Sequence, residues 1–336
     1  MREFNVIDSA VSKEQLQLRL KDTELEQYGE PFKPEFVYEA IKQLPRFVTM
    51  EHGHQQDAEE FLGFLLEGLH DECVYVLKEG KVSSTLASPT SPSASRPSTS
   101  NSESHGWFEV GPKQRSATTQ ASGISNSESP ITKIFGGFLR SEFRVPGLKA
   151  SITVEPYQAL QLDISSPLVR SIGEAFDHLV KPEPIYGNFK SPKGDNVRAV
   201  KQVFIESMPP VLVLHLKRFQ YDQFGGVRKL DKAIEYPLNL EIPETAFAPA
   251  RRAALSRSGG LPRYRLTGVI YHHGSSAAGG HYTVDIRRQD GREWIRIDDT
   301  TIRRIREQDA VATEGPSGKG SEADRKVAYL LLYQRV

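Results

Sequence analysis

Apolar and polar residues follow two different periods along this chain. In the N-terminal part, apolar residues recur at spacings of three and four, as on amphipathic helices. A shorter helix is predicted over Phe36–Leu44, ended by Pro45. A longer one follows Asp57, with its apolar face at Ala58, Phe61, Leu62, Leu65, Leu66 and Leu69. From residue 134 onward strands are predicted, several of them by a period of two, at Ser151–Val154, Ala159–Ile164, Tyr264–Tyr271, His281–Val284, Trp294–Ile297 and Ala328–Tyr333. The nearly continuous apolar run Val211–Leu216 is typical of a central strand.

Two stretches interrupt this pattern. From about Ser83 to Pro130 the chain is rich in Ser, Thr, Pro and Asn, too polar to bury the surface that ordering requires. We therefore expect a helical part over 1–82, a disordered insertion over 83–130 and a strand-rich part over 131–336. Residues 246–262 are expected to form a second irregular loop. A short helix is predicted at Ser171–Val180.

Charge and cysteine content narrow the class of protein. The 43 basic and 43 acidic residues balance, so neither nucleic acid nor an anionic membrane is the expected partner. No apolar run is long enough to span a membrane, and the N-terminus lacks a signal-peptide pattern. Cys73 is the sole cysteine, which excludes an internal disulfide and indicates a reducing compartment. We expect a soluble protein of the cytoplasm, with the nucleus as a second compartment, and no cofactor or metal site.

The candidate chemistry lies in a predicted hairpin. A loop of small residues, Gly274–Gly280, leads to His281, and after a turn at Gln289–Gly291 the second strand ends at Asp298 and Asp299. Such a hairpin can bring His281 opposite Asp298, which would give the base and the orienting acid of a nucleophilic triad. The alternative is that His281 is an ordinary sheet histidine. Gly279 and Gly280 favour the first interpretation, because they remove side-chain bulk where another backbone could approach.

A second acidic position precedes the long helix. Asp57 and Glu60 are three residues apart, as in a capping box, and the helix dipole favours acids there. The same two carboxylates could bind the arginines of a cationic peptide. Both interpretations can hold together, since a cap uses only part of each carboxylate.

Five motifs occur in one order along the chain. They are Gln55–Phe61, Leu214–Phe219, Gly279–Tyr282, Asp298–Asp299 and Ala328–Tyr333. Together they resemble the ubiquitin-specific proteases, papain-like thiol hydrolases that cleave after the C-terminal glycine of ubiquitin. The resemblance implies an α+β fold with a helical thumb, a mixed palm and antiparallel fingers, all in one catalytic domain. It also implies ubiquitin and ubiquitinated proteins as partners, with an unidentified regulatory protein as a further one.

The resemblance assigns catalytic roles to three residues. His281 would be the general base that forms an ion pair with the thiol, and Asp298 would orient its ring. Asp299 would be a second acid that supports the oxyanion.

The remaining roles concern ubiquitin. Gly279 and Gly280 would line the slot for the terminal Gly-Gly of ubiquitin, next to Tyr282. Asp57 and Glu60 would pair with arginines of that tail, and Tyr271 with the 272–278 loop would form a mobile lid.

The chain departs from the family pattern in two places. The stretches expected at the fingertips, 142–150 and 186–201, contain no cysteine, so strand pairing and packing must hold them without zinc. The N-terminal family motif with the nucleophilic cysteine is absent, and with it an asparagine that donates to the oxyanion. Cys73 follows two acids at the end of a helix, which would raise a thiol pKa and disfavours a nucleophile.

We therefore expect an N-terminally truncated catalytic domain that is inactive by itself. The alternatives are a non-catalytic ubiquitin-binding protein and a fragment that does not fold.

Overall fold

The computed structural model describes residues 12, 35–48, 50, 56–85, 119–121, 128–194, 197–221, 226–257, 259–276, 279–288, 291, 293–299, 301–311 and 326–336. Gln55, the turn residues Gln289 and Asp290, and most of the predicted insertion lie outside these residues.

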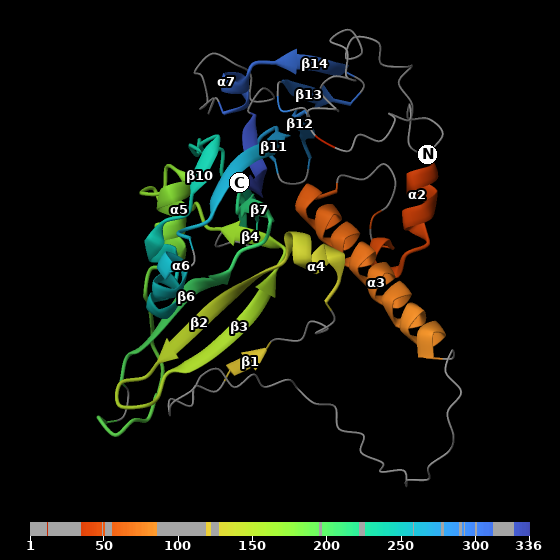
Figure 1. The fold of residues 1–336 in the computed structure, drawn as a ribbon. Helices are drawn as coiled ribbons and strands as arrows, with labels where there is room; N and C mark the ends of the chain where they lie inside the picture. Colours follow the sequence, from red (N-terminus) through yellow and green to blue (C-terminus); the bar gives the residue numbers. More distant parts are fainter. Residues whose placement is uncertain are drawn as a thin grey trace, which may run out of the picture.

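An eight-stranded sheet forms the centre of the fold (Figure 1). Its strands follow the order β14-β13-β12-β11-β15-β7-β4, with β10 also paired to β11. All pairs are antiparallel except β4 with β7. The strands are β4 (Ala159–Leu162), β7 (Val211–Leu216), β10 (Asn239–Glu241), β11 (Arg263–His273), β12 (His281–Arg287), β13 (Trp294–Asp298), β14 (Thr301–Ile305) and β15 (Val327–Arg335).

A five-stranded sheet extends below the first one in Figure 1, in the order β1-β3-β2-β6-β5. It consists of β1 (Thr119–Ala121), β2 (Gly137–Arg144), β3 (Ser151–Tyr157), β5 (Glu183–Ile185) and β6 (Ala199–Ser207). Near its tip, Phe143 packs edge-on against Phe189 with ring centroids 5.5 Å apart. Glu142 lies between Arg140 and Arg144 and pairs with both. Strand pairing, one aromatic contact and one ion-pair network thus hold the region predicted to lack zinc. A separate two-stranded hairpin joins β8 (Phe219–Tyr221) to β9 (Val227–Lys229).

The helices flank the sheets. Figure 1 places α2 and α3 on one side of the eight-stranded sheet and α5 and α6 on the other, with α4 between α3 and β4. Their bounds are α2 (Glu35–Lys42), α3 (Ala58–Thr85), α4 (Pro130–Phe135), α5 (Ile172–Leu179), α6 (Pro249–Arg257) and α7 (Glu307–Ala310), with 3-10 turns at Pro45–Phe47 and Glu244–Ala246. Among the described residues, no helix combines the length and apolar character needed to cross a bilayer.

The main core lies between the eight-stranded sheet and α5. Phe176 of α5, Leu162, Leu214, Leu266 and Leu331 are each fully buried in it. Burial of a side chain of this size contributes about 1.5–3 kcal/mol to folding, so this cluster is a principal source of stability.

Several sequence predictions are confirmed. The predicted strands are all present, and α5 begins at a capping box in which Ser171 and Glu174 bond each other's backbone amides. The helices predicted after Pro34 and Asp57 are α2 and α3.

Three expectations are wrong in part. The 246–262 segment is not wholly irregular, because Pro249 followed by Ala, Arg and Leu residues forms α6. Disorder over 83–130 does not hold for Thr119–Ala121, which pairs with β3 as β1. On α3 the buried face is rotated: Leu66 and His70 are buried while Leu65 and Leu69 are 37% and 38% exposed. The reason is that His70 faces α4, where its Nδ1 lies 2.7 Å from the Ser129 hydroxyl.

Candidate active site

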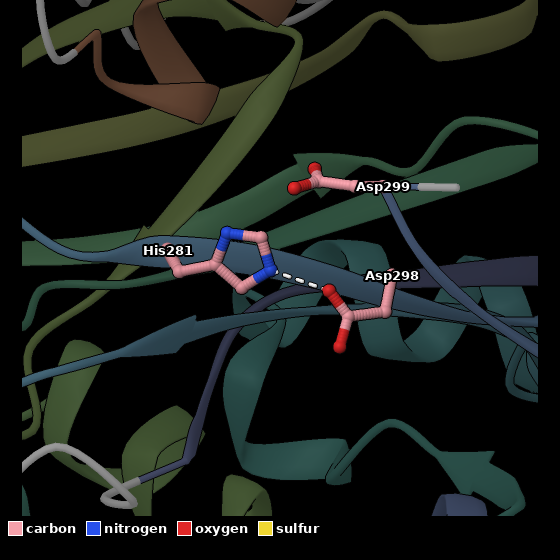
Figure 2. Close-up of side chains that lie close together, drawn as sticks. All are labelled: His281, Asp298 and Asp299. Carbon is pink, nitrogen blue, oxygen red and sulfur yellow. Dashed lines mark hydrogen bonds and ion pairs between the residues drawn. The ribbon is translucent and has the colours of Figure 1, made fainter. Parts of the chain in front are cut away.

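The β12–β13 pair brings His281 and Asp298 together. Asp285 pairs directly with Arg296, so every second residue back to His281 lies on the same sheet face as Arg296 and Asp298. His281 Nε2 is 2.5 Å from Asp298 Oδ1 (Figure 2). Both side chains remain accessible, at 42% and 49% exposed. The predicted juxtaposition is therefore present, where β12 begins and β13 ends.

This hydrogen bond determines which ring nitrogen of His281 is left to accept a proton. A carboxylate only accepts hydrogen bonds, so Nε2–H of the neutral ring donates a hydrogen bond to Asp298, and Nδ1 keeps a lone pair. In Figure 2 the second ring nitrogen points away from Asp298. Nδ1 is therefore the atom of His281 that can take a proton from a reacting group.

Asp299 lies above Asp298 in the view of Figure 2, to the same side of the imidazole. Its backbone φ of 46° is in the left-handed region, because the chain reverses there between β13 and β14. Donor atoms of His281, Asp298 and Asp299 lie within 4.8 Å of one another, close enough to approach a common cation. Since Asp298 already holds His281 through a hydrogen bond, we interpret these three residues as an acid–base site and assign no metal to them.

The two glycines before His281 have different surroundings. A Cβ on Gly280 would lie 2.4 Å from the His273 carbonyl oxygen and 2.6 Å from the His272 ring. A Cβ on Gly279 would meet no atom within 4 Å among the described residues. Gly280 is thus required by the protein's own packing, whereas Gly279 borders open space next to His281.

Two further histidines lie beneath this glycine loop, Gly274–Gly280. His272 is 1% exposed and packs edge-on against Phe219 and Tyr282. His273 Nε2 is 2.8 Å from Thr283 Oγ1. Burial lowers the pKa of each imidazole to about 4. Both rings are therefore neutral at physiological pH.

The N-terminus of α3 meets the sheet next to this site. Asp57 Oδ1 accepts hydrogen bonds from the amides of Glu59 and Glu60, at 2.7 and 3.3 Å, so the capping prediction is confirmed for Asp57. Its Oδ2 accepts a hydrogen bond from Tyr329. The Tyr282 hydroxyl lies 3.4 Å from the Ala58 amide, and burial raises its pKa to about 12. Glu60 itself is exposed.

Tyr271 does not belong to a surface lid. Its side chain is 3% exposed, and its hydroxyl lies 3.0 Å from the Ala310 carbonyl oxygen and 3.1 Å from the Tyr236 hydroxyl. The ammonium of Lys326 covers its ring at 3.6 Å. The lid expectation is wrong for this residue, because Tyr271 belongs to β11 and its side chain is part of the hydrophobic core. Residues 277 and 278 of the expected lid lie outside the described residues.

Comparison with known proteins decides the family. Residues 7–333 match the protein family described as ubiquitin carboxyl-terminal hydrolase. The chain belongs to the ubiquitin carboxyl-terminal hydrolase family.

Curated members of this family include close relatives. The chain is 43% identical over 324 residues to the probable ubiquitin carboxyl-terminal hydrolase 3 of Schizosaccharomyces pombe, covering 91% of this chain and 61% of the relative. It is 37% identical over 317 residues to ubiquitin carboxyl-terminal hydrolase 10 of Xenopus tropicalis, covering 92% and 37%. The chain thus spans less than two thirds of the length of either relative.

The fold is that of solved members of the family. The SAGA Ubp8/Sgf11/Sus1/Sgf73 DUB module bound to ubiquitin aldehyde contains a chain that matches 90% of this one and 54% of its own length, with a TM-score of 0.59 and 23% identity. The expected α+β fold of the ubiquitin-specific protease type is confirmed.

Cys73 is not placed to act as a thiol nucleophile beside His281. Cys73 lies 15 residues after the first residue of α3, which is about 22 Å along the helix axis. The first residue, Ala58, is the one that touches Tyr282, the neighbour of His281. Cys73 is therefore remote from the imidazole. The expectation that Cys73 lies at the end of a helix is wrong, because α3 continues past it to Thr85.

Sequence reasoning missed three residues that contact the candidate active site or the start of α3. Tyr329, His272 and Lys229 contact Asp57, Gly280 and the glycine loop respectively. Each lies far along the chain from its partner or within an apolar strand, where local patterns carry no signal of the contact.

Proposed function

We propose that this chain carries the general-base side and the ubiquitin-tail groove of a cysteine-type deubiquitinase that cleaves after the C-terminal glycine of ubiquitin. One observation carries the proposal: the 2.5 Å contact of His281 with Asp298 lies next to Gly279, which borders open space. The structural relatives described as bound to ubiquitin aldehyde and to monoubiquitin support the choice of substrate.

The contact between His281 and Asp298 supports a separate role for each of them. His281 Nδ1 takes the proton of a cysteine thiol, and the thiolate attacks the carbonyl carbon of the terminal glycine. His281 then returns the proton to the leaving lysine amine as the C–N bond breaks, which leaves a thioester. A water molecule, deprotonated by the same nitrogen, hydrolyses the thioester and restores the thiol. Asp298 holds the ring in one tautomer and stabilises the imidazolium in each step.

The tail of ubiquitin would approach along Gly279. The acids at the start of α3 then lie near its arginines. Because the Asp57 carboxylate already accepts three hydrogen bonds, exposed Glu60 is the better candidate for a bidentate arginine contact. Asp57 would contribute charge at the same place.

The position of Cys73 favours a second candidate function for the chain by itself. With its sole cysteine remote from His281, residues 1–336 would bind ubiquitin without cutting it. A thiol placed next to His281 would be needed for turnover.

Two measurements on the purified 336-residue chain test both statements. Titration with labelled ubiquitin should give saturable binding that Gly279→Trp weakens, while a fluorogenic substrate at the ubiquitin C-terminus should show no turnover. Lack of binding at high micromolar ubiquitin would end the proposal. Turnover that survives Cys73→Ser and is lost in His281→Ala would contradict the assignment of the missing nucleophile.

A further inference from the structure

Lys229, at the end of β9, has a fully buried ammonium group. It donates hydrogen bonds to the carbonyl oxygens of Gly274 and of His272, the latter at 3.4 Å. The Asp231 carboxylate lies 3.3 Å from it. The ammonium thus donates two hydrogen bonds to backbone carbonyls, and the nearby carboxylate balances its charge as an ion pair. A buried charge is tolerated only with such compensation, which indicates a defined position for this side chain.

The two carbonyls mark the start of the glycine loop. Gly274 has a φ of 91°, so the chain turns there in a conformation that favours glycine. A Cβ on Gly274 would lie 3.5 Å from Gly280 Cα, which shows that the two ends of the loop are adjacent. We call these two ends, Gly274 and Gly280, the neck of the loop.

The other side of the neck is held by packing. Gly280 lies directly against the His272 ring, and His273 pairs with His281 across the strands. Lys229 holds the backbone at the end of β11 through its hydrogen bonds to the carbonyl oxygens of His272 and Gly274.

From these contacts we propose that Lys229 is a positioning residue for ubiquitin-tail recognition: by fixing the neck of the glycine loop it sets where Gly279 and His281 lie. The β8–β9 hairpin thereby controls the groove without touching the tail. This inference rests on the proposed function for its substrate, but the anchoring of the neck can be tested independently.

Replacing Lys229 alone would leave Asp231 with its partner removed, so the test uses the neutral pair Lys229→Met/Asp231→Asn. Lys232 supplies a matched control. It comes from the same segment and donates to the carbonyl oxygens of Ile164 and Ser166, at 3.0 and 2.5 Å, remote from the loop. Lys232→Met therefore removes a similar lysine–carbonyl contact that does not involve the neck.

The first readout is the affinity for ubiquitin and for ubiquitin lacking its last two glycines. The Lys229→Met/Asp231→Asn chain should lose about tenfold in affinity for complete ubiquitin and nothing for the shortened form, as expected when one charged hydrogen bond no longer orders the groove. Lys232→Met should leave the ratio of the two affinities unchanged. Equal loss for both forms of ubiquitin, or loss for neither, would overturn the proposal.

The second readout is amide hydrogen exchange in the absence of ubiquitin. Faster exchange at His273, Gly274 and Gly280, with α5 unchanged, is expected for the neutral pair and not for Lys232→Met. Unchanged exchange at the neck would refute the anchoring role even if ubiquitin did not bind. Absence of binding by the unaltered chain, together with a loosened neck in the variant, would instead refute the proposed function alone.

Discussion

The Asp57 carboxylate accepts a 2.6 Å hydrogen bond from the hydroxyl of Tyr329, a residue of the central strand β15. The same carboxylate caps α3 through the amides of Glu59 and Glu60. The Asp57 side chain therefore caps the N-terminus of α3 and also bonds this helix to the sheet. This contact fixes the acidic start of α3 beside Tyr282 and the candidate active site.

Tyr329→Phe should lower the free energy of unfolding by about 1–2 kcal/mol, because the ring stays packed while a half-buried carboxylate loses a donor. Asp57→Ala should cost about 1 kcal/mol more, since the helix cap is lost as well. Urea unfolding measures both. Tyr282→Phe is the control, because its hydroxyl makes only a 3.4 Å contact with the Ala58 amide. A Tyr329→Phe chain as stable as the parent would show that the contact contributes nothing.

The glycine loop provides a second, paired comparison. Gly280→Ala should destabilise the chain by about 1–3 kcal/mol, because its Cβ would collide with the His272 ring and the His273 carbonyl. Gly279→Ala should leave stability within about 0.5 kcal/mol, since its Cβ would enter open space. Thermal unfolding distinguishes the two. Equal stability of the two variants would mean that the close approach at Gly280 is absent in solution.

A buried ion pair joins two directly opposite residues of β12 and β13. Arg296 donates two 2.6 Å hydrogen bonds to Asp285, a fully buried carboxylate directly across the strands. Arg296→Met should cost about 3–5 kcal/mol by removing a main partner of a buried charge. Arg296→Lys should lose less, because it keeps the charge but not the bidentate geometry.

The effect should extend to the active site. If the pair sets the register, the NMR signal of the proton that His281 shares with Asp298 should weaken in Arg296→Met more than in Arg296→Lys. A variant that is destabilised while this signal is unchanged would show that other contacts align His281 with Asp298.

Acid should destabilise the fold through buried histidines. Burial lowers the pKa of His215, His272 and His273 to about 4, below the ordinary value of 6.5. Between these values the unfolded chain binds more protons than the folded one, so stability decreases as the pH falls from about 6.5 toward 4. With three such groups the steepest slope is about 4 kcal/mol per pH unit. Urea unfolding across this range should show it, and His215→Leu should make it shallower. A slope that stays the same in His215→Leu would mean that this residue titrates normally in the folded chain.

Local patterns in the sequence predicted the strands, α5 and the proximity of His281 to Asp298. These features depend on alternation, on a capping box and on a short hairpin, all of which lie within about 20 residues. The roles of the active-site residues in catalysis stay predictions.

What the sequence did not reveal depends on distant partners. Alternation predicts that Tyr271 lies on one face of β11, but it does not say which face is buried. Only the contacts of Tyr271 with Lys326 and Ala310 show that its face packs into the core. On α3, the contact of His70 with Ser129 rotates the buried face away from Leu65 and Leu69. Helix α6 is a different case, since its proline and alanines carried a signal that the irregular-loop prediction overlooked.

The place of β15 between β11 and β7 has a consequence for biosynthesis. Because Val327–Arg335 is inserted in the middle of the eight-stranded sheet, the halves of the sheet on either side cannot join until the ribosome has released that strand. Until then β7 and β11 each present an unpaired edge, which other chains can bind. The nascent protein is thus most vulnerable to aggregation, and most dependent on chaperones, in the interval between the synthesis of β11 and that of β15.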